Sequence, residues 1–304
     1  MEITSIPLSR AAAGVLRVFA DLGDLIFPRS CAGCGAWDTV LCGECTRELC
    51  GQWQDVAART PYLQYIRPAD CAVRGLLWPG DPVPLFAVWS LGEYTGTRRR
   101  VIISWKNAIN RDLTRAIGAM IRHCTLRLAQ MMADHFPAID VVPAPSRPRR
   151  KRDGLFVAGH MAAAVVSGLR DAGIDACVCD VLDAGQQRGD GLLTGRRQKT
   201  RGIGIGSGGL RGVPVLLVDD VVTTGATLAG CWEALRYMPV DSGCDQAYAA
   251  LAGGQSGPER VPAQGMAVDV IGAIVLAAAS DPRGRGEGDS VLRAPRAAYT
   301  GGVA

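Results

Sequence analysis

The chain has 304 residues, of which 48% are hydrophobic and 20% are charged, a balance typical of soluble globular proteins. Its length allows one sizeable domain with appendages, or two domains. The net charge of +4 is too small to predict nucleic acid as a partner of the whole surface. No apolar run reaches the roughly 20 residues of a membrane-spanning helix, and the N-terminus lacks the pattern of a signal peptide. We therefore expect a cytoplasmic protein.

Four cysteines near the N-terminus form two C-x-x-C pairs, namely Cys31 with Cys34 and Cys42 with Cys45. The chain has 11 cysteines, and an odd number with paired spacing favours reduced thiols and a metal site over a disulfide framework. Two such pairs can complete a tetrahedral four-thiolate zinc site with no open position. The sequence therefore predicts a structural zinc, and a redox-active C-x-x-C is the weaker alternative.

The first half of the chain changes from irregular to helical. Residues 15–27 predict a short amphipathic helix, whereas residues 51–84 have no regular pattern. Residues 86–94 alternate between apolar and small side chains like a strand. Residues 97–135 have helical periodicity, and we assign Lys106 to the solvated face of this stretch.

A core strand is expected at 139–143, followed by a cluster of cations at 146–152. Arginine forks match phosphate oxygens in geometry. At the carboxyl end of a strand, such a cluster could therefore hold pyrophosphate, with Arg147 and Arg152 among the binding residues. A solvated basic loop is the alternative interpretation.

A helix at 155–169 and a strand at 176–182 lead into a long polar stretch at 183–209. A loop of this length inside a compact domain is usually functional or disordered, and we interpret it as a flexible lid. Its G-x-G-x-x-G spacing begins at Gly204 and precedes a strand. A dinucleotide-binding loop follows a strand instead, so this motif is rejected.

The most informative segment is 215–228, which joins a buried strand to a helix. Val215 to Val218 form a continuous apolar run, typical of a parallel strand covered on both faces. Asp219 and Asp220 follow at its carboxyl end, where open α/β sheets bind their ligands. Carboxylates accept hydrogen bonds from hydroxyl groups and bind hard cations such as Mg²⁺. This pair is therefore a candidate for sugar or magnesium binding.

The residues that follow predict a loop for a phosphate group, and they are Thr223, Thr224, Gly225, Ala226 and Thr227. Glycine lets the backbone approach a ligand closely, and a helix N-terminus offers unpaired N–H groups to an anion. The helix dipole contributes only about 0.3–2 kcal/mol, so direct hydrogen bonds must carry the affinity. Strand, carboxylates and loop in this order suit a ligand with vicinal hydroxyls and a phosphate ester.

Beyond this helix the pattern weakens. Residues 248–251 predict a further strand. Residues 253–304 are rich in Gly, Pro and Arg and are expected to form a mostly disordered tail, with one apolar patch at 268–279.

Segment 215–228 resembles the phosphoribosyl-pyrophosphate (PRPP) motif of type I phosphoribosyltransferases. The resemblance implies that Asp219 and Asp220 hold the ribose hydroxyls and that Thr223 to Thr227 grip the 5-phosphate, with Mg²⁺ as cofactor. It also implies the fold class, which is an α/β fold with a type I phosphoribosyltransferase-like parallel sheet flanked by helices.

The order of motifs over residues 20–252 is similar to that of the ComF family. It comprises a four-cysteine motif, a helix with Lys106, a Val-Pro-Ala-Pro strand, a basic loop and the PRPP motif. Members of that family are linked to DNA uptake during natural competence. Two loops depart from the family pattern, because Val157 and Gly204 stand where asparagine is usual.

Together, these patterns and the resemblance predict three regions. Residues 1–50 would form the N-terminal helix and the zinc knuckle. Residues 51–252 would form the phosphoribosyltransferase-like domain, with its core at about 136–252, and residues 253–304 would form the tail.

Two functions remain open. The first is an enzyme that transfers a phosphoribosyl group from PRPP to an unidentified acceptor. Asp219 and Asp220 would stabilise cationic character at the anomeric carbon, and Mg²⁺ would neutralise the pyrophosphate. The second is a non-catalytic module that senses a phosphorylated ribose, or that binds single-stranded DNA through the basic stretches at 147–152 and 196–201.

Overall fold

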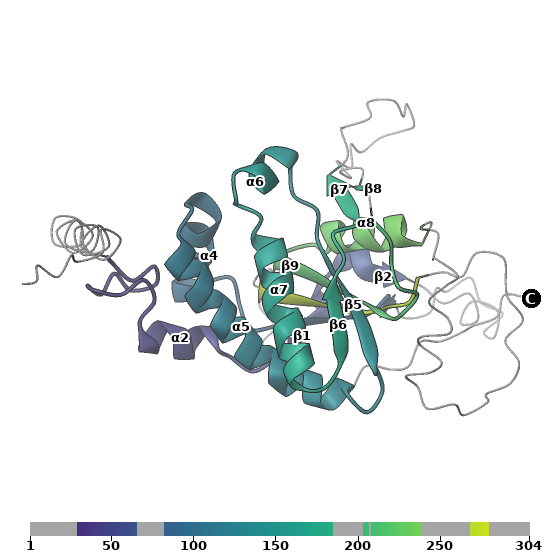
Figure 1. The fold of residues 1–304 in the computed structure, drawn as a ribbon, viewed down its shortest axis with the longest axis horizontal. Helices are drawn as coiled ribbons and strands as arrows, with labels where there is room; N and C mark the ends of the chain where they lie inside the picture. Colours follow the sequence, from purple (N-terminus) through teal and green to yellow (C-terminus); the bar gives the residue numbers. More distant parts are fainter. Residues whose placement is uncertain are drawn as a thin grey trace, which may run out of the picture.

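The computed structural model describes residues 29–65, 82–184, 203–206, 208–236, 238 and 268–279. The helix expected at 15–27, the strand expected at 248–251 and most of the predicted lid lie outside these ranges. Figure 1 shows an α/β arrangement in which helices flank a mostly parallel sheet. In the described ranges, no helix is both long enough and apolar enough to cross a membrane.

Six strands form the central sheet, in the order β1-β4-β10-β9-β5-β6. In that order their bounds are Gln54–Asp55, Ala87–Ser90, Val270–Ala278, Val215–Val222, Ala138–Pro143 and Asp175–Val178. Neighbouring strands pair in parallel except β1 and β4, which are antiparallel. Two small antiparallel pairs lie outside this sheet, which are β2 (Gln64–Tyr65) with β3 (Val83–Pro84) and β7 (Leu182–Ala184) with β8 (Ile203–Ile205).

Helices cover both faces of the sheet. Their bounds are Gly43–Leu49 (α2), Gly96–Asn107 (α4), Arg111–Met132 (α5), Pro148–Arg152 (α6), Val157–Asp171 (α7) and Ala226–Leu235 (α8), with short 3-10 turns at Ala57–Arg59 (η1) and Pro61–Leu63 (η2). Helices α5 and α7 share a core with Leu216 and Val218 of β9, whereas α8 shares a second core with Val215 and Leu217. Alternate residues of β9 therefore face opposite layers, which confirms the buried parallel strand predicted from its apolar run.

The helical stretch predicted at 97–135 consists of two helices, α4 and α5. Asn110 begins the second helix, because its side-chain oxygen accepts a hydrogen bond from the N–H of Leu113 (2.9 Å) and caps α5. The strand predicted at 176–182 is also divided, into β6 and β7. The predicted strand at 139–143 and helix at 155–169 correspond to β5 and α7.

The cysteine-rich segment is fixed to the start of α4. Arg98 donates hydrogen bonds to the carbonyl oxygens of Glu48 (2.9 Å) and Leu91 (3.0 Å), which join α2 to the loop after β4. Arg100 donates a hydrogen bond from Nε to the carbonyl oxygen of Gly33. Helix α4 therefore carries several of the contacts that hold the cysteine segment against the α/β domain, and an ion pair between Arg29 and Asp112 of α5 (2.8 Å) adds to them.

The apolar patch predicted at 268–279 is strand β10, in the interior of the sheet. Its register places Val275 beside Ser90 of β4 and beside Asp219 of β9. The prediction of a mostly disordered tail at 253–304 is therefore wrong for residues 270–278. A strand buried on both faces is a short apolar run without periodicity, and the Gly-, Pro- and Arg-rich sequence around this run led to its assignment to the tail.

A chain that ends at residue 252 is expected to lose the cooperative unfolding transition. Truncation removes β10 and uncovers β4 and β9, and each buried large apolar side chain contributes about 1.5–3 kcal/mol. Ile271, Ile274, Val275 and Leu276 are all buried, so the summed loss is comparable with the roughly 5–15 kcal/mol that stabilises a domain. Thermal unfolding followed by circular dichroism tests this, with a chain that ends at residue 280 as the control. Equal midpoints for the two chains would contradict the central role of β10.

Candidate functional site

Two adjacent carboxylates lie near the carboxyl end of β9, as predicted. The backbone N–H of Asp220 donates a hydrogen bond to Oδ1 of Asp219 (2.8 Å), and both residues are only partly exposed. The strand continues beyond them, because Val221 and Val222 pair with Ala277 and Ala278 of β10. The strand is therefore longer than the apolar run from Val215 to Val218 predicted, and the carboxylates lie two residues before its end.

The carboxylates also lie at a point where the connections of the sheet diverge. Strand β9 leads to α8 on one face, whereas its neighbour β5 leads through α6 to α7 on the other face. Open α/β sheets bind ligands in the crevice that such a divergence leaves at the carboxyl ends of the strands. The position of Asp219 and Asp220 is therefore that of a ligand site in this class of fold.

Lys106 completes the charge pattern of the site. Its Nζ lies 2.8 Å from Oδ1 of Asp220, and the two side chains are 27% and 16% exposed. Our assignment of Lys106 to a solvated face is therefore wrong. Ile102, four residues earlier, is buried, and residues four apart share one face of a helix. The sequence thus contained a signal that Lys106 points toward the domain.

Asp219 has an unusual acidity for a carboxyl group. Its burial and the nearby charge of Asp220 raise the pKa of Asp219 to about 7. The hydrogen bond from the N–H of Asp220 and the ammonium of Lys106 lower this pKa but do not offset the first two causes. Asp219 can therefore gain or lose a proton near neutral pH. When protonated it can donate a hydrogen bond to a hydroxyl group, and when ionised it can accept one.

The loop Thr223–Thr227 leads directly into α8. Gly225 occupies the N-cap with φ +80°, a left-handed conformation, and no side chain caps the helix. A Cβ at Gly225 would lie 2.9 Å from Cβ of Thr60 and 3.1 Å from Cγ of Leu63 in η2, so both the backbone angle and this close approach favour glycine. Thr223, Thr224 and Thr227 are exposed. Their hydroxyls and the first N–H groups of α8 are therefore available to an anion.

The predicted basic loop is in part a short helix. Residues 148–152 form α6, Arg147 stands at its N-cap, and Arg147 and Arg152 are both exposed. Among the arginines of this cluster, Arg150 lines a cavity together with the carboxylates, and it donates a hydrogen bond to the carbonyl oxygen of Lys106 (2.5 Å). Which arginine faces the carboxylates depends on the helical turn of α6, and the run of cations in the sequence did not predict this turn.

A small cavity of about 60 Å³ lies between α6, the end of α4 and the carboxylates, and Lys106, Arg150, Asp219 and Asp220 are among its lining residues. A larger cavity of about 420 Å³ adjoins it, because Leu155 and Val157 line both. Its wall combines Trp105 and Ile109 with polar residues that include Arg111, Arg152 and His160. The structure therefore places Arg152 at this second cavity and not beside the carboxylates.

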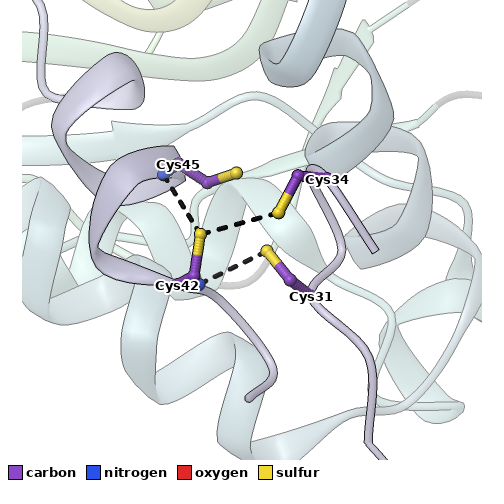
Figure 2. A group of neighbouring side chains, drawn as sticks. All are labelled: Cys31, Cys34, Cys42 and Cys45. Atoms are coloured by element: carbon purple, nitrogen blue, oxygen red, sulfur yellow. Dashed lines mark hydrogen bonds between the residues drawn. The ribbon is translucent and has the colours of Figure 1, made fainter. Parts of the chain in front are cut away.

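The four predicted metal-binding cysteines come together in one cluster. Their Sγ atoms all lie within 4.8 Å of one another, and those of Cys34 and Cys42 are 3.7 Å apart. Figure 2 shows the side chains converging from two segments, with Cys31 and Cys34 on one and Cys42 and Cys45 on the other. A cluster of this kind can hold a metal ion.

Local backbone groups support charge on this cluster. Burial raises the pKa of the Cys31 thiol, but hydrogen bonds from the backbone at Cys34 and Cys42 outweigh it and hold this pKa at about 6. Cys31 is therefore the thiol that most readily becomes a thiolate, the form that binds metals, whereas burial and the neighbouring thiols raise the pKa of Cys45. Gly33 allows the close packing, since a Cβ there would lie 2.6 Å from Sγ of Cys45 and 2.7 Å from Cγ2 of Thr97 on α4.

The acidity of Asp219 makes a pH dependence testable. Because the folded chain raises the pKa of Asp219 to about 7, from an ordinary value of about 3.9, the folded state binds this proton more tightly than the unfolded state. The contribution of Asp219 to stability therefore falls as pH rises from about 4 to about 7. Asp219→Asn removes this contribution. The stability of the variant minus that of the wild type should therefore increase as the pH is raised from 5 to 8.

Thermal midpoints of both proteins at these two pH values measure the effect. Asp134→Asn, at an exposed position just beyond the C-terminal end of α5, serves as the control and should show the same pH profile as the wild type. A constant difference in midpoint between the wild type and Asp219→Asn would contradict the raised pKa.

Comparison with protein-family models finds no model that matches this chain, and comparison with curated proteins finds no significant sequence match. The case for a function therefore depends on the residues and on the geometry of the site.

Proposed function

We propose that the chain binds a 5-phosphorylated ribose, with PRPP as the leading candidate, on a type I phosphoribosyltransferase-like fold. The observation that carries this proposal is the continuous unit of β9, the loop Thr223–Thr227 and α8. It presents two carboxylates and an uncapped helix N-terminus in succession. Carboxylates suit the vicinal hydroxyls of a ribose, and the loop and the helix N-terminus suit its phosphate.

The cations around the carboxylates support a ligand with more than one phosphate. Lys106 and Arg150 border the small cavity beside Asp219 and Asp220, on the side of β5 and α6. The loop Thr223–Thr227 does not line this cavity. The loop would therefore receive the 5-phosphate of a ribose, and the two cations would receive a pyrophosphate at C1.

The ion pair between Lys106 and Asp220 has a direct role in this proposal. Without ligand, the ammonium neutralises one of two adjacent carboxylates, which lowers their mutual repulsion. When ribose hydroxyls donate to the carboxylates, Lys106 is free to turn toward pyrophosphate oxygens. The same cation thus stabilises both the free and the bound chain.

Mg²⁺ fits the donor set of this site. Asp219 and Asp220 offer the hard oxygen ligands that Mg²⁺ prefers, and it usually completes its shell with water and substrate phosphates. When bound, the ion would supply charge neutralisation of the pyrophosphate. The residues of the chain would orient the ribose, and their carboxylates would stabilise positive charge at the anomeric carbon if pyrophosphate leaves. The larger cavity beside the site offers space for an acceptor.

Calorimetric titration of PRPP and of ribose 5-phosphate, each with magnesium, tests the proposal. The Asp219→Asn, Asp220→Asn double variant should lose affinity by about 100-fold or more, because hydrogen bonds to charged groups are each worth about 1.5–3 kcal/mol. Lys106→Gln should lower the affinity for PRPP more than the affinity for ribose 5-phosphate, since only PRPP carries a pyrophosphate. Asp134→Asn should bind both ligands like the wild type.

Unchanged affinity in the double variant would move the ligand site away from β9. Release of pyrophosphate, measured in the same samples with candidate bases and amines as acceptors, separates the two functions. Binding with release supports the transferase. Binding without release under any of these conditions supports the non-catalytic sensor. The basic stretch at 196–201, on which the DNA-binding alternative also depends, lies outside the described residues.

We also propose that the ion held by the four-cysteine cluster is a structural zinc. In a tetrahedral site with Zn–S bonds near 2.3 Å, neighbouring sulfurs are about 3.8 Å apart, and the Sγ atoms of Cys34 and Cys42 are 3.7 Å apart. Four cysteines leave no open position, which is typical of a structural site. The zinc would fix the segment that packs on α4, the helix that carries Lys106.

One zinc ion per chain should therefore survive gel filtration in buffer without added metal. Cys34→Ser should lose this ion and lower the thermal midpoint, because metal binding to the folded state contributes to folding. Cys50→Ser, in the same segment but outside the cluster, should keep the zinc ion and the thermal midpoint of the wild type. Equal zinc content in the two variants, by atomic emission spectroscopy, would contradict the assignment.

A further inference from the structure

A second group of metal-binding side chains lies in the sheet itself. Asp140 of β5 is 0% exposed, and its register partner is Cys177 of the neighbouring strand β6. Cys179 follows two residues later, so its side chain leaves the chain on the same face as that of Cys177. This group lies near the start of β9, where Asp140 pairs with Val215, and it is separate from the carboxylates at the other end of that strand.

The three side chains approach as closely as ligands of one ion. The Sγ atoms of Cys177 and Cys179 are 3.5 Å apart, and Sγ of Cys177 lies 3.3 Å from Oδ1 of Asp140. All three donor atoms lie within 4.8 Å of one another. In a tetrahedral zinc site, two sulfurs are about 3.8 Å apart and a sulfur and an oxygen about 3.6 Å apart. The observed spacings need to change by only a few tenths of an ångström.

Arg211 holds the carboxylate of Asp140 in place but leaves one of its lone pairs without a hydrogen bond from Arg211. The backbone N–H of Arg211 donates to Oδ2 of Asp140 (2.7 Å), and its Nε donates to Oδ1 (2.6 Å). The same guanidinium also donates to Asp175 (2.8 Å), at the start of β6. A carboxylate offers about four lone-pair sites, so Oδ1 retains one that faces Cys177. Arg211 thus orients Asp140 as a supporting residue orients a metal ligand.

We propose that Asp140, Cys177 and Cys179 form a second metal site, which binds a thiophilic divalent cation such as Zn²⁺ or Cd²⁺. Thiolate ligands select soft or borderline ions of this class over Mg²⁺ or Ca²⁺. Three protein ligands leave a fourth position open, in contrast to the closed four-cysteine cluster. The site is therefore expected to bind its ion exchangeably.

Charge balance favours a divalent ion. With both thiols protonated, the group contains the carboxylates of Asp140 and Asp175 and the guanidinium of Arg211, so it carries one negative charge. Binding of the ion as a dithiolate complex breaks two S–H bonds, forms two metal–sulfur bonds and releases two protons to solvent. The divalent charge replaces the two protons, so the net charge of this buried group does not change.

A disulfide between the two cysteines fits the geometry less well. Residues two apart in a strand have Cα atoms about 6.4–6.8 Å apart, at the upper end of the roughly 4.4–6.8 Å that disulfides span. The two sulfurs would also have to approach from 3.5 Å to about 2.05 Å. An ion that bridges the sulfurs requires neither change. Cys177 is partly exposed, which gives an ion access from solvent.

Alkylation of the unmutated full-length chain tests the proposal without risk to folding. Protein that already holds its tightly bound zinc is treated with N-ethylmaleimide in the presence or absence of added Zn²⁺, and each cysteine is followed by peptide mass spectrometry. Added zinc should slow the modification of Cys177 and Cys179 together. Cys50, which is also partly exposed but belongs to neither group, is the internal control and should not change. Equal rates at Cys177 with and without zinc would overturn the proposal.

Native mass spectrometry with added Zn²⁺ supplies the second readout. The wild type should bind one ion more than the Cys177→Ser, Cys179→Ser double variant. Asp140→Asn, which keeps both thiols, should lower the affinity for this ion. The decrease should be at least the roughly 10–100-fold that loss of a supporting residue costs. Cys231→Ser removes another buried thiol and should bind like the wild type. The same number of ions in the wild type and in the double variant would show that the additional zinc binds elsewhere and would refute the site.

Discussion

Two carboxylates side by side within a buried strand are the constraint on which the rest of the site depends. Asp219 and Asp220 repel each other and are poorly hydrated, and the raised pKa of Asp219 reflects this cost. Lys106 offsets part of it through its ion pair with Asp220. The helix that carries this cation, α4, is packed into the core through Val101, Ile102 and Trp105, and at its other end Arg98 and Arg100 bind the cysteine segment. The cysteine cluster and the carboxylates are thus linked through a single helix.

The sequence predicted those parts of the fold that depend on local patterns. The apolar run at Val215 is a buried strand that contains the carboxylates, and the loop around Gly225 leads into a helix, as expected. Lys106 and Arg150 were not predicted to approach the carboxylates, because their directions depend on how α4 and α6 pack against the sheet. Strand β10 was assigned to a tail because its partners lie far away in the sequence and its neighbours are of low hydrophobicity.

At both ends of the parallel sheet, buried carboxylates are neutralised by cations from other segments of the chain. Asp140 is fully buried and is held by Arg211 through its backbone N–H and its Nε. A buried carboxylate without such a partner would cost several kcal/mol. In each case the cation comes from a segment outside the strand that bears the carboxylate, so the ion pair also joins two elements of the fold. At Asp219 and Asp220 this compensation leaves reactive oxygens at a cavity, whereas at Asp140 it leaves one oxygen that faces two thiols.

The position of β10 has a consequence for how the chain folds during synthesis. Val275 pairs with Ser90, a residue of the first third of the chain, and β10 lies between β4 and β9. Until β10 leaves the ribosome, β4 and β9 each present an unpaired edge, and unpaired edges promote association with other chains. Parallel strands that are distant in sequence also pair slowly, because a long loop must close first. The edge of β4 therefore stays unpaired from the synthesis of residue 90 until that of residue 278, and the edge of β9 from residue 222 onward. During this interval both edges can associate with other chains, which chaperones that shield nascent strands would prevent.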